Sequence, residues 1–233
     1  MGEMALGYGS EYQLLRFLGH HRNYLDNEIL KSLNKKDVRL EWLDYPADKT
    51  RFSLDKELKG IECFKKEPNY DFIKSEWEKF WPQRGNIQNW DGIFKIDDDW
   101  YFVEAKAYKD ELNKPCGASD NESLSTIKNA LAQVITKFNA QSTPDFWVSK
   151  ENKAYQFVNR LAFIVFCEKI GIKARLVYIN FINGYDKPDT QGKMSVPDEN
   201  TWKKVWDEEY KRLGLSEESP KEVLFHVYID CEK

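Results

Sequence analysis

Residues 89–108 read NWDGIFKIDDDWYFVEAKAY and place charged residues within two apolar runs. The first run, DGIFKI, begins with Asp91, and the second, WYFVEAKAY, contains Glu104 and Lys106. Carboxylate and ammonium groups resist leaving water unless something pairs with them, so a charged pair in the middle of a strand normally costs stability. The position of these charges therefore needs an explanation.

The two runs are expected to form a hairpin across the acidic tip DDD, whose residue types favour a turn. If Ile96 pairs with Asp99 across a two-residue turn, the register carries Asp91 opposite Glu104. Strand alternation places Glu104 and Lys106 on the same face. Directly opposed residues have Cβ atoms about 5 Å apart. Two carboxylates and one ammonium group should therefore converge on a patch that suits a divalent cation.

These three side chains are suited to phosphodiester hydrolysis. A hard cation such as Mg²⁺ takes oxygen ligands and keeps several waters, and Asp91 and Glu104 can supply the carboxylates. Such a cation polarises a phosphoryl oxygen and makes a bound water more acidic. Lys106 can orient or deprotonate that water and offset the developing charge on the phosphate.

Asp91, followed after twelve residues by Glu104, Ala105 and Lys106, resembles the signature of the PD-(D/E)XK nuclease superfamily, which has the restriction-endonuclease-like fold. The resemblance implies an α/β fold whose central mixed sheet is flanked by helices. It implies Mg²⁺ (or Mn²⁺) bound by Asp91, Glu104 and the Ala105 main-chain carbonyl, and a catalytic role for Lys106. Trp90 stands where many members have proline. The phrases EYQLLRFLGHHRN, FWPQRGNIQNWDG and YQFVNRLAF look similar to a group of uncharacterised bacterial proteins that carry the same core.

The function implied by the resemblance is a magnesium-dependent nuclease that hydrolyses phosphodiester bonds of DNA. Two alternatives stay open: an inactive nuclease-like module that binds nucleic acid or protein, and a homo-oligomer or subunit whose partner brings the DNA-binding surface. A plainer alternative is a hairpin whose exposed face bears a Lys–Glu pair of little energetic weight.

Members of this superfamily often add an acidic residue from a helix before the sheet. Glu11 and Glu76 are the contenders, and Glu11 is the tentative metal ligand, because its helix resembles the related group more closely. Each has a plain explanation as well. Glu11 favours a helix N-terminus through the helix dipole, and Glu76 can simply face solvent.

Further polar residues lie on segments that are expected to be helical. Gln156, Asn159 and Arg160 open an otherwise apolar helix. Arg160 either reaches a phosphate or belongs to a buried polar network or ion pair that closes the core, and the latter is favoured. Gln133 is either an accessory residue of the site or an exposed helix residue.

Periodicity and turn residues predict the remaining elements. Ser10 and Gln13 form a capping box for the first of two short helices that break near Gly19. Alternating residues predict a strand over 38–45, and Ser123 is expected to cap a helix. Further helices are expected over 71–81, about 152–170 and up to Gly214, and strands over 174–183 and 222–230.

Composition limits the class of protein. The 233 residues, of which 41% are hydrophobic, suffice for one α/β domain over 1–233 with elaborations at both ends. A net charge of -4 gives no global basic field, so contact with nucleic acid would need a local patch. The four cysteines form no Cys-x-x-Cys pair, and no apolar run approaches the roughly 20 residues of a membrane span. The start lacks the features of a signal peptide, so we expect a cytoplasmic protein.

Overall fold

Two antiparallel strands form the hairpin that the sequence predicts. In the computed structural model, β4 (Gly92–Ile96) pairs with β5 (Asp99–Lys106), and Ile96 lies opposite Asp99. Asp97, in the two-residue turn, has φ 54°, a left-handed conformation that aspartate tolerates and that short hairpin turns require. The expected register is therefore confirmed from the Ile96–Asp99 pair to the Gly92–Val103 pair, where the ladder ends before Asp91.

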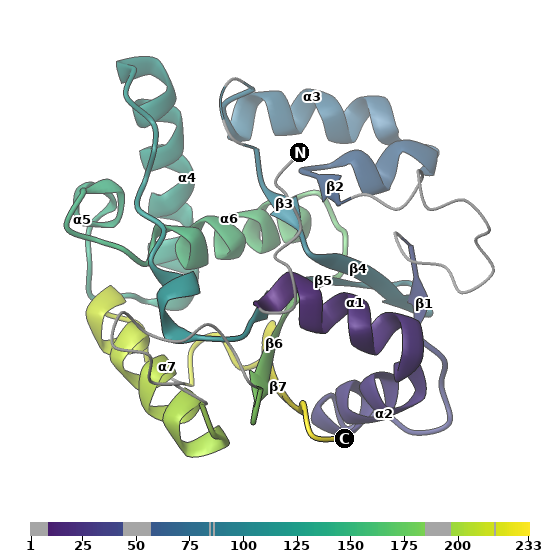
Figure 1. Ribbon diagram of the computed structural model, residues 1–233. Helices are drawn as coiled ribbons and strands as arrows, with labels where there is room; N and C mark the ends of the chain where they lie inside the picture. Colours follow the sequence, from purple (N-terminus) through teal and green to yellow (C-terminus); the bar gives the residue numbers. More distant parts are fainter. Residues whose placement is uncertain (1–8, 44–56, 84, 86, 185–196, 217) are drawn as a thin grey trace.

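The structure describes residues 9–43, 57–83, 85, 87–184, 197–216 and 218–233, which Figure 1 draws in colour. Within these ranges, no helix has both the length and the apolar character needed to cross a membrane.

A five-stranded mixed sheet lies at the centre of the fold, in the order β1-β4-β5-β6-β7 (Figure 1). Its remaining strands are β1 (Glu41–Trp42), β6 (Ala174–Ile182) and β7 (Leu224–Asp230). β1, β4 and β5 pair antiparallel, whereas β5, β6 and β7 pair parallel. A second, two-stranded sheet joins β2 (Leu58–Lys59) to β3 (Asn89–Trp90). The expected α/β class with a mixed central sheet is confirmed.

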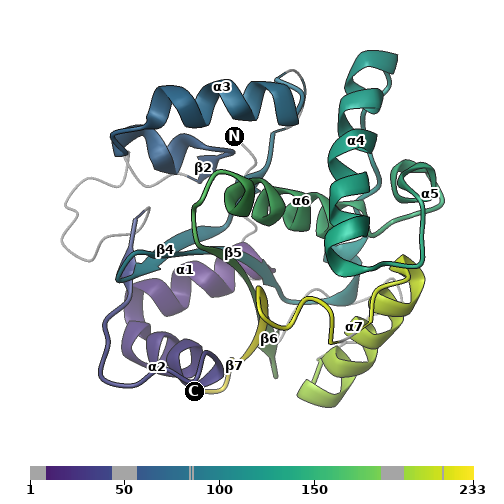
Figure 2. The same ribbon diagram turned by 180° about the vertical axis from the view of Figure 1, so that it is seen from behind.

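Helices cover both faces of this sheet (Figures 1 and 2). One face packs against α1 (Ser10–His20) and α2 (Arg22–Ser32). The other face packs against α3 (Tyr70–Phe80), α4 (Asn121–Phe138), α5 (Pro144–Val148), α6 (Tyr155–Lys169) and α7 (Glu199–Leu213). Two 3₁₀ turns, η2 (Glu62–Lys66) and η3 (Lys109–Leu112), complete the described elements.

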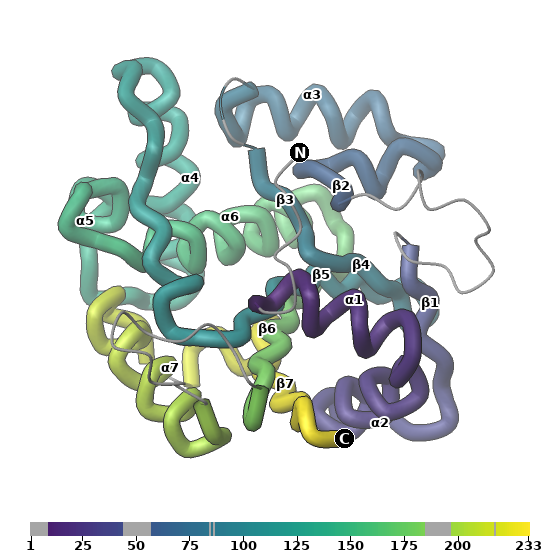
Figure 3. The backbone as a smooth tube through the Cα atoms, in the orientation of Figure 1, coloured from purple at the N-terminus to yellow at the C-terminus, as the bar shows by residue number. Residues whose placement is uncertain are grey.

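The chain crosses from β5 to the parallel strand β6 through α4, α5 and α6, as the tube in Figure 3 shows. Parallel neighbours require such a crossover, because a tight turn cannot join them. Every residue of α6 from Phe157 to Cys167 is buried, which explains why this segment is apolar nearly all round. Side chains that α6 turns toward the sheet are consequently held away from water.

Two of the predicted helix starts are wrong. Asp120, not Ser123, caps α4, because its carboxylate accepts a hydrogen bond from the Ser123 N–H at 2.8 Å. Ser10 is the first residue of α1 rather than its cap, and Gly9 precedes it without a side-chain cap. The break between α1 and α2 falls at His21, two residues after Gly19.

The strand expected over 38–45 is shorter than predicted. Within the described residues only Glu41 and Trp42 form strand β1, opposite Lys95 and Phe94. The strand end expected at Pro46 lies outside the described residues, because residues 44–56 are not described.

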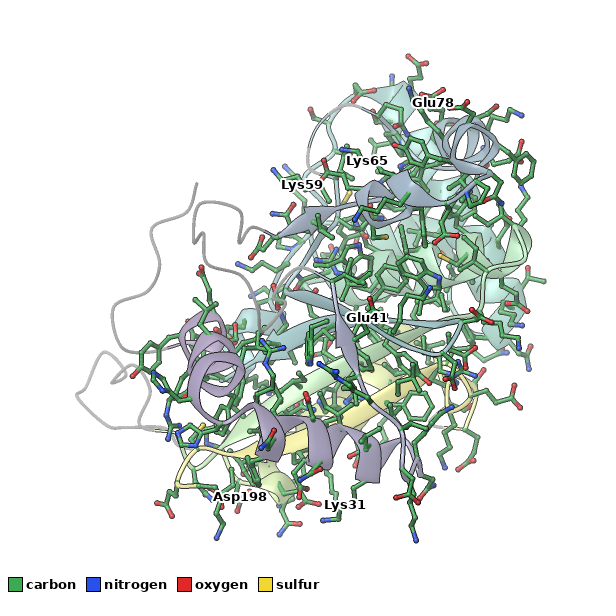
Figure 4. The ribbon with its side chains drawn as sticks, turned by 90° about the vertical axis from the view of Figure 1, so that its right-hand side faces the viewer. Lys31, Glu41, Lys59, Lys65, Glu78 and Asp198 are labelled. Atoms are coloured by element: carbon green, nitrogen blue, oxygen red, sulfur yellow. The ribbon has the colours of Figure 1, made fainter. Side chains whose placement is uncertain are left out.

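Basic side chains are spread over the surface described. Lys31 extends from the α2 side of the sheet, whereas Lys59 and Lys65 extend from β2 and η2 on the opposite side, with Glu41 between them (Figure 4). Lys31 and Lys65 each pair with a glutamate three residues away, Glu28 and Glu62. This arrangement agrees with the absence of a global basic field.

Candidate functional site

Asp91 lies directly before β4, beside residues 103–105 of β5. Its N–H donates to the Val103 carbonyl at 3.2 Å, and its Oδ2 accepts from the Ala105 N–H at 2.7 Å. The ladder between β4 and β5 ends at the Gly92–Val103 pair, so β4 does not reach the Ala105 N–H. The Asp91 side chain accepts the hydrogen bond that a longer β4 would have accepted at this edge of β5. Asp91 is thereby held at the open edge of β5.

The Ala105 carbonyl faces the same open edge. The N–H and C=O of one strand residue point to the same side, and the Ala105 N–H points to Asp91. The main-chain oxygen expected to face a metal therefore lies on the side where Asp91 lies.

Glu104 and Lys106 share the face of β5 that α6 covers. Glu104 is 1% exposed and Lys106 4%, and Lys106 Nζ lies 2.6 Å from Glu104 Oε1. Phe102, on the same face, packs with the α6 cluster, while Val103 packs with the α1 and α2 cluster. The alternative of an exposed Lys–Glu pair is therefore wrong, because both charges are buried.

Arg160 of α6 is a fourth member of this cluster. Its Nε donates to Glu104 Oε2 at 2.7 Å, and its Nη2 donates to the Asn89 carbonyl at 2.7 Å. Its guanidinium carbon also lies 4.8 Å from the centroid of the Trp90 ring. The favoured interpretation of Arg160 as part of a buried ion pair agrees with these contacts.

The buried charges shift the pKa values of the three predicted residues. Burial and the negative charge of Glu104 raise the pKa of Asp91 to about 8. Burial alone would raise the pKa of Glu104, but Arg160 and Lys106 outweigh it and lower that pKa. Burial would lower the pKa of Lys106, but the Glu104 and Asp91 carboxylates outweigh it and raise that pKa. These shifts favour ionised Glu104 and cationic Lys106 at neutral pH, and they favour the protonated form of Asp91 well above its ordinary pKa.

Glu11 lies near Glu57, and Glu57 in turn lies near Asp91. Glu11 is exposed, and partial burial together with the charge of Glu57 raises its pKa. Glu57 accepts a hydrogen bond from Asn89 Nδ2 at 2.9 Å and adds to the raised pKa of Asp91. Glu57 gave no signal in the sequence, because the pairing of β2 with β3 brings it here. The role of Glu11 as a metal ligand stays a prediction.

Glu76 and Gln133 lie on helix surfaces. Glu76 pairs with Lys79 on α3, at 2.6 Å. Gln133 is exposed on α4 and donates to the Asn129 carbonyl within its own helix. These positions agree with the plain explanations, in which Glu76 faces solvent and Gln133 is an exposed helix residue.

Two further residues, Glu111 and Gln156, complete the surroundings of the site. Glu111 of η3 accepts hydrogen bonds from the Ala107 N–H at 2.7 Å and the Ser10 N–H at 3.1 Å, which ties the end of β5 to the start of α1. Gln156 precedes Arg160 by one helical turn, and its Oε1 is buried without a hydrogen-bond partner among the described residues. Gln156 was weighed with Arg160, whereas nothing in the loop sequence pointed to Glu111.

A cavity of about 160 Å³ lies elsewhere, between α7 and β7. Trp206, Tyr210 and His226 are among its lining residues, and none of the candidate site residues lines it. The candidate site is a buried ion-pair cluster with Asp91 at its open edge.

Searches against protein-family models, curated proteins and solved structures return no match to this chain. The superfamily resemblance therefore stays a prediction that rests on the signature and the geometry described above.

Proposed function

We propose that this protein is a divalent-metal-dependent nuclease of the PD-(D/E)XK type that hydrolyses phosphodiester bonds of DNA. One observation carries the proposal: Asp91, bonded to the main chain of Val103 and Ala105, lies beside Glu104, and Lys106 Nζ lies 2.6 Å from the Glu104 carboxylate. Two carboxylates and one lysine gathered on a single hairpin are the parts that metal-assisted phosphodiester hydrolysis uses.

The donor groups fit a hydrated Mg²⁺ or Mn²⁺ ion. No group of three or more His, Cys, Asp or Glu side chains in the described ranges could hold a metal. Mg²⁺ in such sites usually takes one or two carboxylates and keeps several waters. Asp91 and Glu104, with the Ala105 carbonyl, offer such a set of oxygens. The raised pKa of Asp91, which reflects burial and the charge of Glu104, is a conflict that a divalent cation would relieve.

Each residue has a role that follows from its environment. When bound, the cation would polarise a phosphoryl oxygen and make a water more acidic. Lys106 stays protonated, because the carboxylates beside it raise its pKa, so it suits neutralising charge on the phosphate better than taking a proton. Asp91, at the open edge, and the buried Glu104 are the candidates for holding the cation.

One observation favours the alternative of an inactive nuclease-like binding module. Both oxygens of Glu104 already bind cationic side chains, and the carboxylate is 1% exposed. A site of this kind can serve structure alone. Metal binding separates the two proposals, because only a competent site gains stability from Mg²⁺ or Mn²⁺.

The test of the nuclease proposal is incubation with plasmid and single-stranded DNA, with Mg²⁺ or Mn²⁺ and with chelator. We expect metal-dependent hydrolysis that falls about 100-fold or more in Lys106→Ala, the usual cost of removing one preorganised electrostatic group. Lys95→Ala is the matched control, because Lys95 lies on the same hairpin against the Trp100 ring, with its Nζ 4.8 Å from the ring centroid. Equal hydrolysis by wild type and Lys106→Ala would refute the proposal.

A further inference from the structure

β7 forms one edge of the central sheet, and no described strand lies beyond it. Two hydrogen bonds show which of its main-chain groups face β6. The Val223 carbonyl accepts from the Leu176 N–H at 2.7 Å. The Cys231 N–H donates to the Ile182 carbonyl at 2.9 Å. The N–H and C=O of one strand residue point to the same side, and successive residues alternate. The even-numbered residues of β7 therefore point their main-chain groups away from β6, toward the open edge.

Four of these outward groups have no hydrogen-bond partner among the described residues: the N–H and C=O of His226 and of Tyr228. The outward N–H groups on either side of them are already bonded. The Leu224 N–H donates to a carbonyl of the preceding turn at 2.8 Å, and the Asp230 N–H donates to the Tyr24 hydroxyl at 3.3 Å. The open part of the edge therefore lies at the middle of β7.

This edge lacks the features by which native sheets avoid pairing with other chains. Such sheets keep edge strands very short or place charged residues, prolines or bulges on them. Residues 224–229 read LFHVYI, without a charged residue or a proline, and they pair with β6 without a bulge. β1, at the opposite edge, spans two described residues and carries the exposed Glu41. The contrast favours a partner strand beside β7.

The open edge is complementary to a second copy of itself. In an antiparallel pair, two residues that face each other exchange both of their main-chain hydrogen bonds. If a two-fold axis passes at Val227, His226 of each copy faces Tyr228 of the other, and all four outward groups of each copy are bonded. A longer strand from another protein would find the N–H groups of Leu224 and Asp230 already bonded. A closed two-fold contact of this kind is the commonest arrangement of identical chains.

The cavity between α7 and β7 offers room for a side chain of the second copy. It measures about 160 Å³, and Trp206, Tyr210 and His226 are among its lining residues. A cavity of about 150 Å³ accommodates a benzene ring. Directly opposed residues lie on the same face of a sheet, with Cβ atoms about 5 Å apart. Tyr228 of the second copy would therefore stand beside His226, where its ring meets these aromatic walls.

We propose that two copies of this protein pair antiparallel through β7, with the two-fold axis at Val227. The contact joins two five-stranded sheets into one, and Tyr228 of each copy enters the cavity of the other. The inference does not depend on the proposed function, because none of the candidate site residues lies on β7 or lines this cavity.

The experiment is light scattering after size-exclusion chromatography of the full chain at rising concentrations. We expect the wild type to approach twice the mass of one chain. Tyr228→Pro removes an N–H that faces away from β6, a place where strands tolerate proline. Tyr228→Lys adds a residue that native proteins place on exposed edges. Both variants should stay monomeric at concentrations at which the wild type is a dimer. Phe72→Lys is the matched control, because Phe72 is 54% exposed on α3, and it should dimerise like the wild type.

Disulfide cross-linking tests the register. Opposed residues of an antiparallel pair that exchange no hydrogen bonds have Cα atoms about 4.5 Å apart, which a disulfide can span. Val227→Cys should therefore cross-link two copies on oxidation, above the background that the four native cysteines set in the wild type. Ile229→Cys is the matched control. It lies on the same face of β7 and is also buried, but it would face Phe225 of the second copy and should not cross-link.

The inference fails if the wild type is monomeric at every concentration. It also fails if the two Tyr228 variants dimerise as strongly as the wild type, or if Phe72→Lys dissociates the dimer, because the contact then lies elsewhere. Should the Tyr228 variants not fold, cross-linking decides. No cross-link in Val227→Cys, or an equal one in Ile229→Cys, would refute the proposed pairing.

Discussion

Glu104 carries a buried negative charge that two cations from different elements neutralise. Lys106 could be placed beside it from the sequence, because residues two apart on a strand share a face. The bond to Arg160 could not be chosen in advance, because it depends on how α6 crosses the sheet. Glu57 and Glu111 could not be chosen in advance either. Their hydrogen bonds to Asn89 and Ala107 depend on long-range folding that local sequence patterns do not encode.

Removing the charge of Glu104 should destabilise the fold strongly. Glu104→Gln leaves Lys106 and Arg160 without their shared counter-charge, and breaking a buried pair costs about 3–5 kcal/mol. Urea unfolding at neutral pH measures this loss. Glu76→Gln, which breaks an ion pair on the surface of α3, should leave the free energy of unfolding close to that of the wild type. Equal effects of the two substitutions would contradict the buried pairing.

Asp91 should make the metal-free protein less stable as the pH rises. Its pKa is about 8 in the folded chain against an ordinary value of 3.8, so the folded state holds the extra proton between these values. The stabilisation that this proton gives is complete below about pH 3.8 and is lost progressively up to about pH 8.

Asp91→Asn mimics the protonated carboxyl group, so it should match the wild type near pH 4. By pH 8, with chelator present, it should be more stable by at least about 1.4 kcal/mol, the equivalent of one pKa unit. Asp98→Asn in the exposed turn is the control. A stability difference that does not change with pH would refute the assignment.

At the scale of elements, periodicity located most helices and strands, and turn chemistry fixed the register of the hairpin. α3, α6, β6 and β7 lie where apolar spacing predicts them. The errors fall at helix starts. Asp120 and Ser123 are both good caps, and which one serves depends on the path of the preceding loop. Within the described residues, β1 pairs with β4 over Glu41 and Trp42 alone, which alternation does not reveal.

The end of α7 offers a test of this local chemistry. Gly214 has φ 67°, and a Cβ there would lie 2.2 Å from the Gln141 carbonyl oxygen. Gly214→Ala should therefore destabilise the fold by more than about 1 kcal/mol. Gly19→Ala, in α1 with no atom within 4 Å of the new Cβ, should stabilise it by about 0.5–1 kcal/mol. Thermal unfolding compares the two, and an unchanged Gly214→Ala would show that the turn tolerates a side chain.

At the scale of the whole molecule, the sequence predicted the class and the charged hairpin but not the strand order. The place of β5 between β4 and β6, and the crossing of α6 over it, come from long-range packing that one chain's pattern does not specify. That packing buries Glu104 and Lys106 and leaves Asp91 at the open edge of β5. The central claim is that Asp91 and Glu104 share one divalent cation there.

The most direct measurement is thermal unfolding with increasing Mn²⁺. An ion that binds only the folded state at about a hundred times its Kd adds about 2.7 kcal/mol, which for a chain of this length raises Tm by roughly 5–10 °C. We predict this rise in the wild type and in Asp99→Ala, whose carboxylate pairs with Arg175 at the hairpin tip, and no rise in Asp91→Ala. An unchanged wild-type Tm, or an equal rise in Asp91→Ala, would contradict the claim.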